Sequence, residues 1–169
     1  MGRARFWDAV SRGVSGIRPI TEFDASPFSN RVSGAVPLDE LRAAGVELDE
    51  AADESHTNGH RPANGNGRGN GNGRADPRRY AKVSRIAVLA AREALQDAGL
   101  AEGDPDLGVI VGSGAGGIDV AERQYGEFFS GAFHRVSPYA IPVSIVGIVS
   151  SEISIALGLR GISHVLSTG

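Results

Sequence analysis

The sequence predicts an α/β fold with layered packing, and three observations support this. Apolar residues recur at helical spacing from Val83 to Leu95, which is typical of a helix with one buried face. A continuous apolar run at 107–111 is typical of a strand buried on both faces. A second strand pattern at 163–168 follows two further helical segments. The expected order is helix, strand, glycine turn, helix, helix, strand.

Residues 1–49 form the first of three regions, in which a short helix precedes turn-rich chain. Apolar residues from Trp7 to Val14 lie three and four apart, which predicts the helix. The prolines that follow predict extended segments and turns. A brief helix is expected to begin at Leu38 and end at Gly45.

Residues 50–76 form the second region, which has low complexity. Five Asn-Gly pairs lie between Asn58 and Gly73, and large apolar residues are absent. Such a segment cannot offset the entropy lost on ordering the chain. The region is predicted to be a disordered surface insertion, and a weak anionic contact through its arginines is the less favoured interpretation.

Residues 77–169 form the third region, which is strongly patterned. Its first helix is expected to end at Gly99, where a left-handed cap is needed. The strand at 107–111 leads into a glycine turn at 112–117 and then a helix over 118–129.

A second apolar helix is expected after the next loop. Pro142 suits its first turn, and Gly158 marks its end. Its apolar side is expected to pack in the core rather than to bind a ligand, and comprises Ile145, Ile148, Val149, Ile153 and Ala156.

Gly112, Gly114 and Gly117 satisfy the pattern G-x-G-x-x-G between a strand and a helix, which is the dinucleotide fingerprint. A dinucleotide site also needs an acidic residue about 20 positions further on. That neighbourhood, 134–138, has no carboxylate. The sequence therefore favours two other interpretations, namely that the glycines permit close packing and that they line a pocket that side chains would obstruct.

Composition excludes several functional classes. A net charge of −3 gives no case for binding nucleic acid or an anionic membrane. The absence of cysteine excludes a disulfide scaffold, a cysteine metal site and a thiol nucleophile within these residues. The most apolar stretch, 141–149, is far shorter than the roughly 20 residues of a membrane span. We expect a soluble, cytoplasmic chain.

Several blocks in the expected order carry a resemblance to a known family. They are 110–117, 136–142, 158–161 and 163–169, and upstream 6–10, 13–17 and 23–26. The chain resembles the β-ketoacyl-[acyl-carrier-protein] synthases, KAS II-like condensing enzymes of the thiolase superfamily. The resemblance implies the N-terminal half of a thiolase-like fold, layered α/β/α and incomplete. The first strand expected before Phe6 is missing.

The resemblance implies chemistry that these residues lack. Such enzymes move an acyl chain from carrier protein onto a cysteine thiolate, which a helix N-terminus stabilises. They then decarboxylate a malonyl thioester and join the resulting carbanion to the acyl group. By resemblance the cysteine follows Gly169 directly, and the catalytic histidines lie beyond it. We therefore expect no catalytic residue in this chain, no catalytic role for His134 or His164, and no activity from the chain alone.

The resemblance also assigns substrate-binding residues. Ala115 and Ala140 correspond to the wall of the acyl pocket, and Ile141 to a residue that reaches the partner's pocket across a dimer. Two small side chains would leave room for a long or branched acyl chain. The equally weighted alternative is that both alanines are small for packing. No cofactor and no metal are implied.

The implied partners are acyl carrier protein and its acyl and malonyl thioesters. The intact protein would be a homodimer or a ketosynthase/chain-length-factor heterodimer, joined along the strand 163–168. Lys82, Arg85 and Arg160 are weak candidates for carrier-protein contacts. Two alternatives stay open: a non-catalytic, chain-length-factor-like subunit, which the residue after Gly169 would reveal, and a nucleotide-binding α/β domain.

Overall fold

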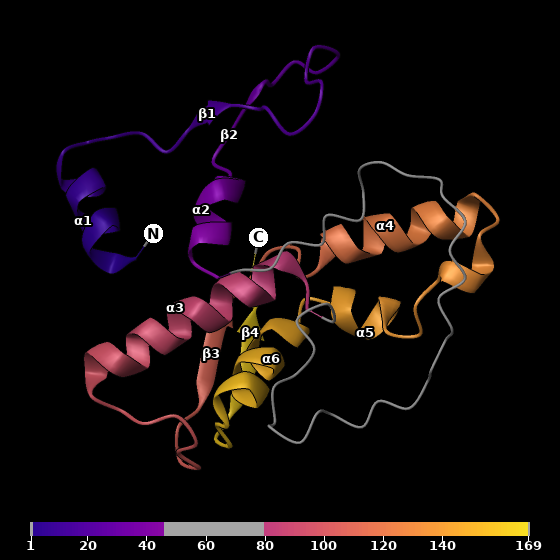
Figure 1. The fold of residues 1–169 in the computed structure, drawn as a ribbon. Coiled ribbons are helices and arrows are strands. Elements are labelled where there is room, and N and C mark those ends of the chain that lie inside the picture. The colour runs from indigo at the N-terminus through magenta and orange to yellow at the C-terminus, as the bar shows by residue number, and fades with distance from the viewer. Residues whose placement is uncertain (1, 46–79, 169) are drawn as a thin grey trace. The chain divides into compact units, whose positions relative to one another are not determined.

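A computed structural model describes residues 2–45 and 80–168 of the chain (Figure 1). The chain divides into two compact units, Met1–Glu47 and Leu48–Gly169, and each is considered by itself. The predicted insertion at 50–76 lies outside the described residues.

The first unit contains two helices and a minimal hairpin. Helix α1 spans Arg3–Ser11 and helix α2 spans Leu38–Ala43, as the sequence predicts. Strands β1 (Arg18–Pro19) and β2 (Val32–Ser33) pair antiparallel between them. The proline-rich stretch therefore contains extended segments and turns, as expected.

An ion pair links the two helices of this unit. The Arg5 guanidinium on α1 donates two hydrogen bonds to the Glu40 carboxylate on α2, of 2.9 and 3.0 Å. Such a forked geometry suits arginine and carboxylate. Because the Arg5 side chain is largely exposed, its contribution to stability is small.

The second unit has the predicted order of elements with one difference. Its elements are α3 (Lys82–Ala98), β3 (Val109–Gly112), α4 (Ile118–Phe129), the 3-10 turn η2 (Phe133–Arg135), α5 (Ala140–Ser144), α6 (Ile148–Leu157) and β4 (Ser163–Leu166). Helix α3 ends at Gly99, whose φ of +68° is the left-handed cap that the sequence predicts.

Strands β3 and β4 pair in parallel, although 50 residues separate them along the chain. Val109 lies opposite Ser163 and Gly112 lies opposite Leu166. The pairing extends past the strand at its carboxyl end, where Ser113 N donates to Leu166 O at 3.1 Å. The two carboxyl ends therefore lie side by side.

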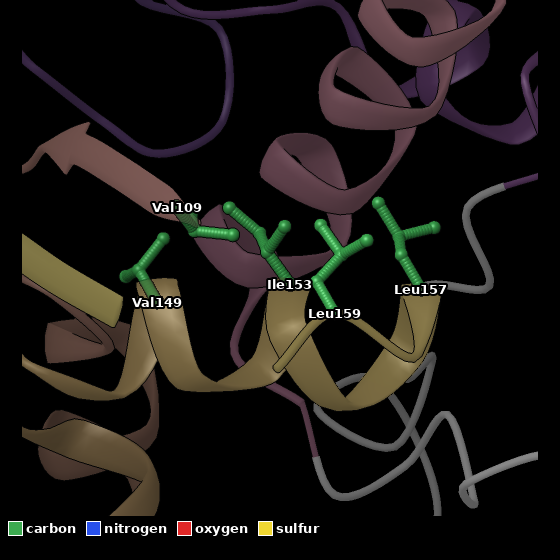
Figure 2. Close-up of a cluster of buried hydrophobic side chains, with 5 residues drawn as sticks. All are labelled: Val109, Val149, Ile153, Leu157 and Leu159. Atoms are coloured by element: carbon green, nitrogen blue, oxygen red, sulfur yellow. The ribbon is translucent and has the colours of Figure 1, made fainter. Parts of the chain in front are cut away.

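Helix α6 supplies three of the five residues of the larger buried cluster of this unit. Val149, Ile153 and Leu157 project from the same side of α6, and Val109 of β3 points into the same layer (Figure 2). Leu159 completes the cluster. Residues of α3, β3 and β4 pack against it, including Val83, Ala87, Val88, Ala91, Leu95, Val111 and Val165. Sheet and helices therefore form the expected layers.

The predicted single helix from Pro142 to Gly158 is wrong, because the structure has two helices there. The chain leaves helical geometry at Ile145, whose ψ is 148°. Ile145, which the sequence predicts to pack in the core, is 52% exposed. The physical reason is packing against the glycine turn, whose backbone approaches the break so closely that a Cβ on Gly116 would lie 2.8 Å from Ile145 O and 2.6 Å from Val146 Cα.

The core assignment predicts unequal effects from two truncations on α6. Leu157→Ala removes a side chain that is 1% exposed and should lower the free energy of unfolding by about 2–5 kcal/mol. Ile155→Ala, at a side chain that is 69% exposed, should change it by less than about 0.5 kcal/mol. Urea denaturation of both variants measures this. Equal losses would contradict the assignment.

Candidate functional site

The candidate site lies at the carboxyl edge of the parallel pair β3–β4. In parallel α/β sheets, ligands bind outside the carboxyl ends of the strands. Here β3 leads into the glycine turn 112–117, and β4 leads into Ser167 and Thr168 beside it. Helix α5 packs on α4 and on the turn. Three segments far apart in sequence therefore meet at one edge.

Hydrogen bonds from backbone N–H groups hold the glycine turn in place. Ser113 N donates to Leu166 O, which joins the turn to the end of β4. Gly116 N donates to the Ser113 hydroxyl at 3.2 Å, which closes the turn on itself. Gly117 N donates to Ser144 O at 3.2 Å, which joins the turn to the end of α5.

These bonds bear on the nucleotide alternative. A pyrophosphate site uses the free N–H groups of its glycine turn and of the helix that follows. In this turn three of those groups already have acceptors within the chain. The turn therefore connects β4 to α5 through hydrogen bonds. Because these N–H groups are already used, the turn is a poor binding site for a dinucleotide.

The close-packing interpretation is confirmed for Gly117 and not for the other two glycines of the motif. A Cβ on Gly117 would lie 2.3 Å from Val143 O and 2.8 Å from the Ala81 Cβ. Gly112 and Gly114 have no heavy atom within 4 Å of that position. Gly116, which the motif does not require, is also tightly packed and has a φ of +57°. In the sequence, the two consecutive glycines at 116 and 117 are the feature that indicates this tight packing.

The predicted substrate-binding residues lie on the turn and on α5. Ala115 is on the turn and exposed. Ala140 is half-buried at the start of α5, and Ile141 next to it is 63% exposed. The backbone contacts of Gly116 and Gly117 bring their two segments together.

A side chain that sequence reasoning missed fixes the approach to α5. Gln124 on α4 accepts a hydrogen bond through Oε1 from Ser137 N at 2.6 Å. Because Gly117 holds the end of α5 and Gln124 holds the chain before it, α5 is attached to the turn-and-helix unit at both ends. A lone glutamine on an exposed helix gives no such signal in the sequence.

The edge carries no ionisable side chain along 112–117, 140–144 or 167–168. These segments cannot supply a general acid or base, and they suit contact with an uncharged, apolar group.

The two histidines of the described residues lie outside these segments. His134 lies in η2, and His164 lies on β4 with its side chain exposed. Among the residues that the structure describes, no cluster of His, Cys, Asp or Glu could hold a metal ion. Within the same ranges no helix is long and apolar enough to span a membrane.

Comparisons with known proteins all point to the β-ketoacyl synthase family. A model of the β-ketoacyl synthase N-terminal domain matches residues 1–169. The 3-oxoacyl-[acyl-carrier-protein] synthase 2 of Staphylococcus aureus strain N315 is 29% identical over 158 residues, covering 92% of this chain. The synthase 2 of Coxiella burnetii is 28% identical over the same length. The chain spans about a third of each relative, 32% in both cases.

A solved structure shares the fold. The ishigamide ketosynthase/chain length factor matches with a TM-score of 0.62 and 23% identity, covering 99% of this chain and 36% of that one. The predicted α/β, thiolase-like architecture is thereby confirmed.

The joint at the glycine turn predicts a contrast between two alanine substitutions. Gly117→Ala places a methyl group against the α5 backbone and should lower the free energy of unfolding by about 1–3 kcal/mol. Gly114→Ala meets open space and should leave it unchanged or raise it by about 0.4–1 kcal/mol. Urea denaturation of both variants tests this. A Gly117→Ala variant as stable as the parent would show that the turn and α5 are not in such close contact.

Proposed function

Because the chain belongs to the β-ketoacyl synthase family, we propose that it forms part of a condensing enzyme that extends an acyl chain by decarboxylative Claisen condensation with malonyl-acyl carrier protein. The observation that carries this is the parallel pairing of β3 with β4. It brings the end of β4 beside the glycine turn, which also contacts α5. An acyl group bound to the end of that strand would meet the small or apolar side chains of these segments.

In the proposed reaction a cysteine thiolate directly after Gly169 attacks the thioester carbonyl of an acyl carrier protein. The carrier thiolate leaves and takes up a proton, and the acyl group stays on the cysteine sulfur. A malonyl thioester then loses carbon dioxide, and its carbanion attacks the acyl carbonyl, which releases the cysteine thiolate. The described residues would bind the acyl chain, while nucleophile and histidines come from residues beyond Gly169. The chain alone is therefore expected to be inactive.

The nucleophile assignment predicts a covalent adduct. We would express the reading frame with the codons that follow Gly169 in its gene and incubate it with an acyl-acyl carrier protein. Intact mass spectrometry should show one acyl group added per chain, lost when the residue after Gly169 is changed to alanine. The 169-residue chain is the control and should acquire none.

The other outcomes are also decisive. A residue other than cysteine after Gly169, with no acylation, would replace the enzyme proposal with a chain-length-factor-like subunit. Saturable binding of NAD or ATP by the 169-residue chain would overturn the condensing-enzyme interpretation in favour of a nucleotide-binding domain.

The pocket assignment predicts a change in chain-length preference. Ala115→Phe in that longer protein should shorten the longest primer that acylates it, because the ring would fill part of a channel left open by a methyl side chain. Ala94→Phe, at an exposed position on α3, is the matched control. A parent protein restricted to acetyl primers would contradict the assignment of a roomy pocket to Ala115 and Ala140.

The proposed partners follow from the same reaction. They are acyl carrier protein with its acyl and malonyl thioesters, and a second subunit, identical or chain-length-factor-like, that pairs along β4 and meets Ile141. The edge strand β4 keeps one side of its backbone open within the described residues, which suits pairing with another strand. We also propose that the protein is cytoplasmic, because the proposed reaction uses acyl carrier protein.

A further inference from the structure

A carboxyl group lies inside the contact between α3 and α6. Glu152 on α6 is only 5% exposed, and Ser84 on α3 is fully buried. Glu152 precedes Ile153 and follows the buried Ser150 and Val149, so it interrupts the face that forms the core. Charged side chains are almost never this buried unless they are paired.

The surroundings of this carboxyl group do not fully satisfy it. Neither Glu152 Oε2 nor Ser84 Oγ makes a hydrogen bond of good geometry among the described residues, although the serine hydroxyl is close enough to favour the charged carboxylate. A buried polar atom without a partner costs free energy, and a charged one costs more.

The charged and titratable groups around Glu152 can be named element by element. From α3 the Arg85 guanidinium favours the ionised form, and Tyr80, just before α3, lies close enough for the carboxylate to raise its pKa in addition to the effect of burial. Helix α6 also packs on β3, β4 and α5. Their one titratable side chain, His164, alternates with the core residue Val165 and is exposed.

Burial outweighs these favourable groups. Desolvation raises the pKa of the Glu152 carboxyl to about 7, while Ser84 and Arg85 lower it by less. At the lower end of the physiological range, the folded chain therefore holds a proton on Glu152 that an unfolded chain would lose.

We propose that Glu152 makes the packing of α3 on α6 sensitive to pH: the neutral carboxyl group is accommodated between the two helices, and its ionisation weakens their contact. Because α6 packs on β3, β4 and α5, the weakening reaches the hydrophobic cluster that α6 forms with Val109 and Leu159. This inference does not depend on the proposed enzymatic function.

The direction of the effect follows from proton linkage. An acid whose pKa is raised in the folded state binds more protons when folded than when unfolded. Stability is therefore fully retained below the ordinary glutamate pKa of 4.5, declines as pH rises towards 7, and stays low above it. Between these two pKa values the folding equilibrium constant falls about tenfold for each unit increase in pH. The constant therefore falls on the order of 100-fold in total.

The test compares urea unfolding of the 169-residue chain with that of Glu152→Gln from pH 5 to pH 8.5. The folding equilibrium constant of the parent should fall on the order of 100-fold relative to the glutamine variant over this range. Glu122→Gln, at an exposed position on α4, is the matched control and should follow the parent. Parallel pH profiles for the parent and Glu152→Gln would overturn the proposal.

A second measurement covers the case in which the variant does not fold. Carbon-13 NMR of the parent, labelled at glutamate carboxyl carbons, should show a resonance that titrates near pH 7. Titration of every glutamate between about pH 4 and 5 would overturn the proposal without any variant.

Discussion

The parallel pairing of β3 with β4 is the constraint on which the second unit depends. The intervening chain must fold into α4, α5 and α6 and return so that β4 enters the sheet beside β3. Helix α6 then covers one face of the pair, and its buried side chains meet Val109 in a single cluster (Figure 2). The same pairing aligns the two carboxyl ends, and this is what creates an edge at which a site can form.

The glycine turn connects this edge to α5. Its N–H groups donate to the end of β4 and to the end of α5, and its two consecutive glycines allow backbone to approach backbone. Any side chain at Gly117 would meet the α5 carbonyl of Val143, so the position of α5 and the identity of that residue are linked. Core packing and site geometry are thus controlled by the same few residues.

The sequence predicted the elements whose signals are local. The periodicity of α3 and its left-handed glycine, the bounds of α4 and the apolar run of β3 are all readable within a short window. The division between α5 and α6 was not, because it depends on the close approach of Ile145 and Val146 to a turn about 30 residues earlier. The burial of Glu152 was not predictable either, since a glutamate on a helix ordinarily faces water, and its burial here depends on how other elements, α3 among them, pack on α6. Ala115, Ala140 and Ile141 were assigned by resemblance alone, because small and apolar residues carry no chemical signal of their own.

Amide hydrogen exchange measured residue by residue tests most directly whether the turn is a structural joint between β4 and α5. Ser113 and Gly117, whose N–H groups donate to Leu166 and Ser144, should exchange slowly, at rates set by opening of the second unit. Gly114, whose N–H donates no backbone hydrogen bond within the described residues, should exchange fast. Fast exchange at Ser113 and Gly117 as well would contradict the account, because it would mean that the turn is free of β4 and α5.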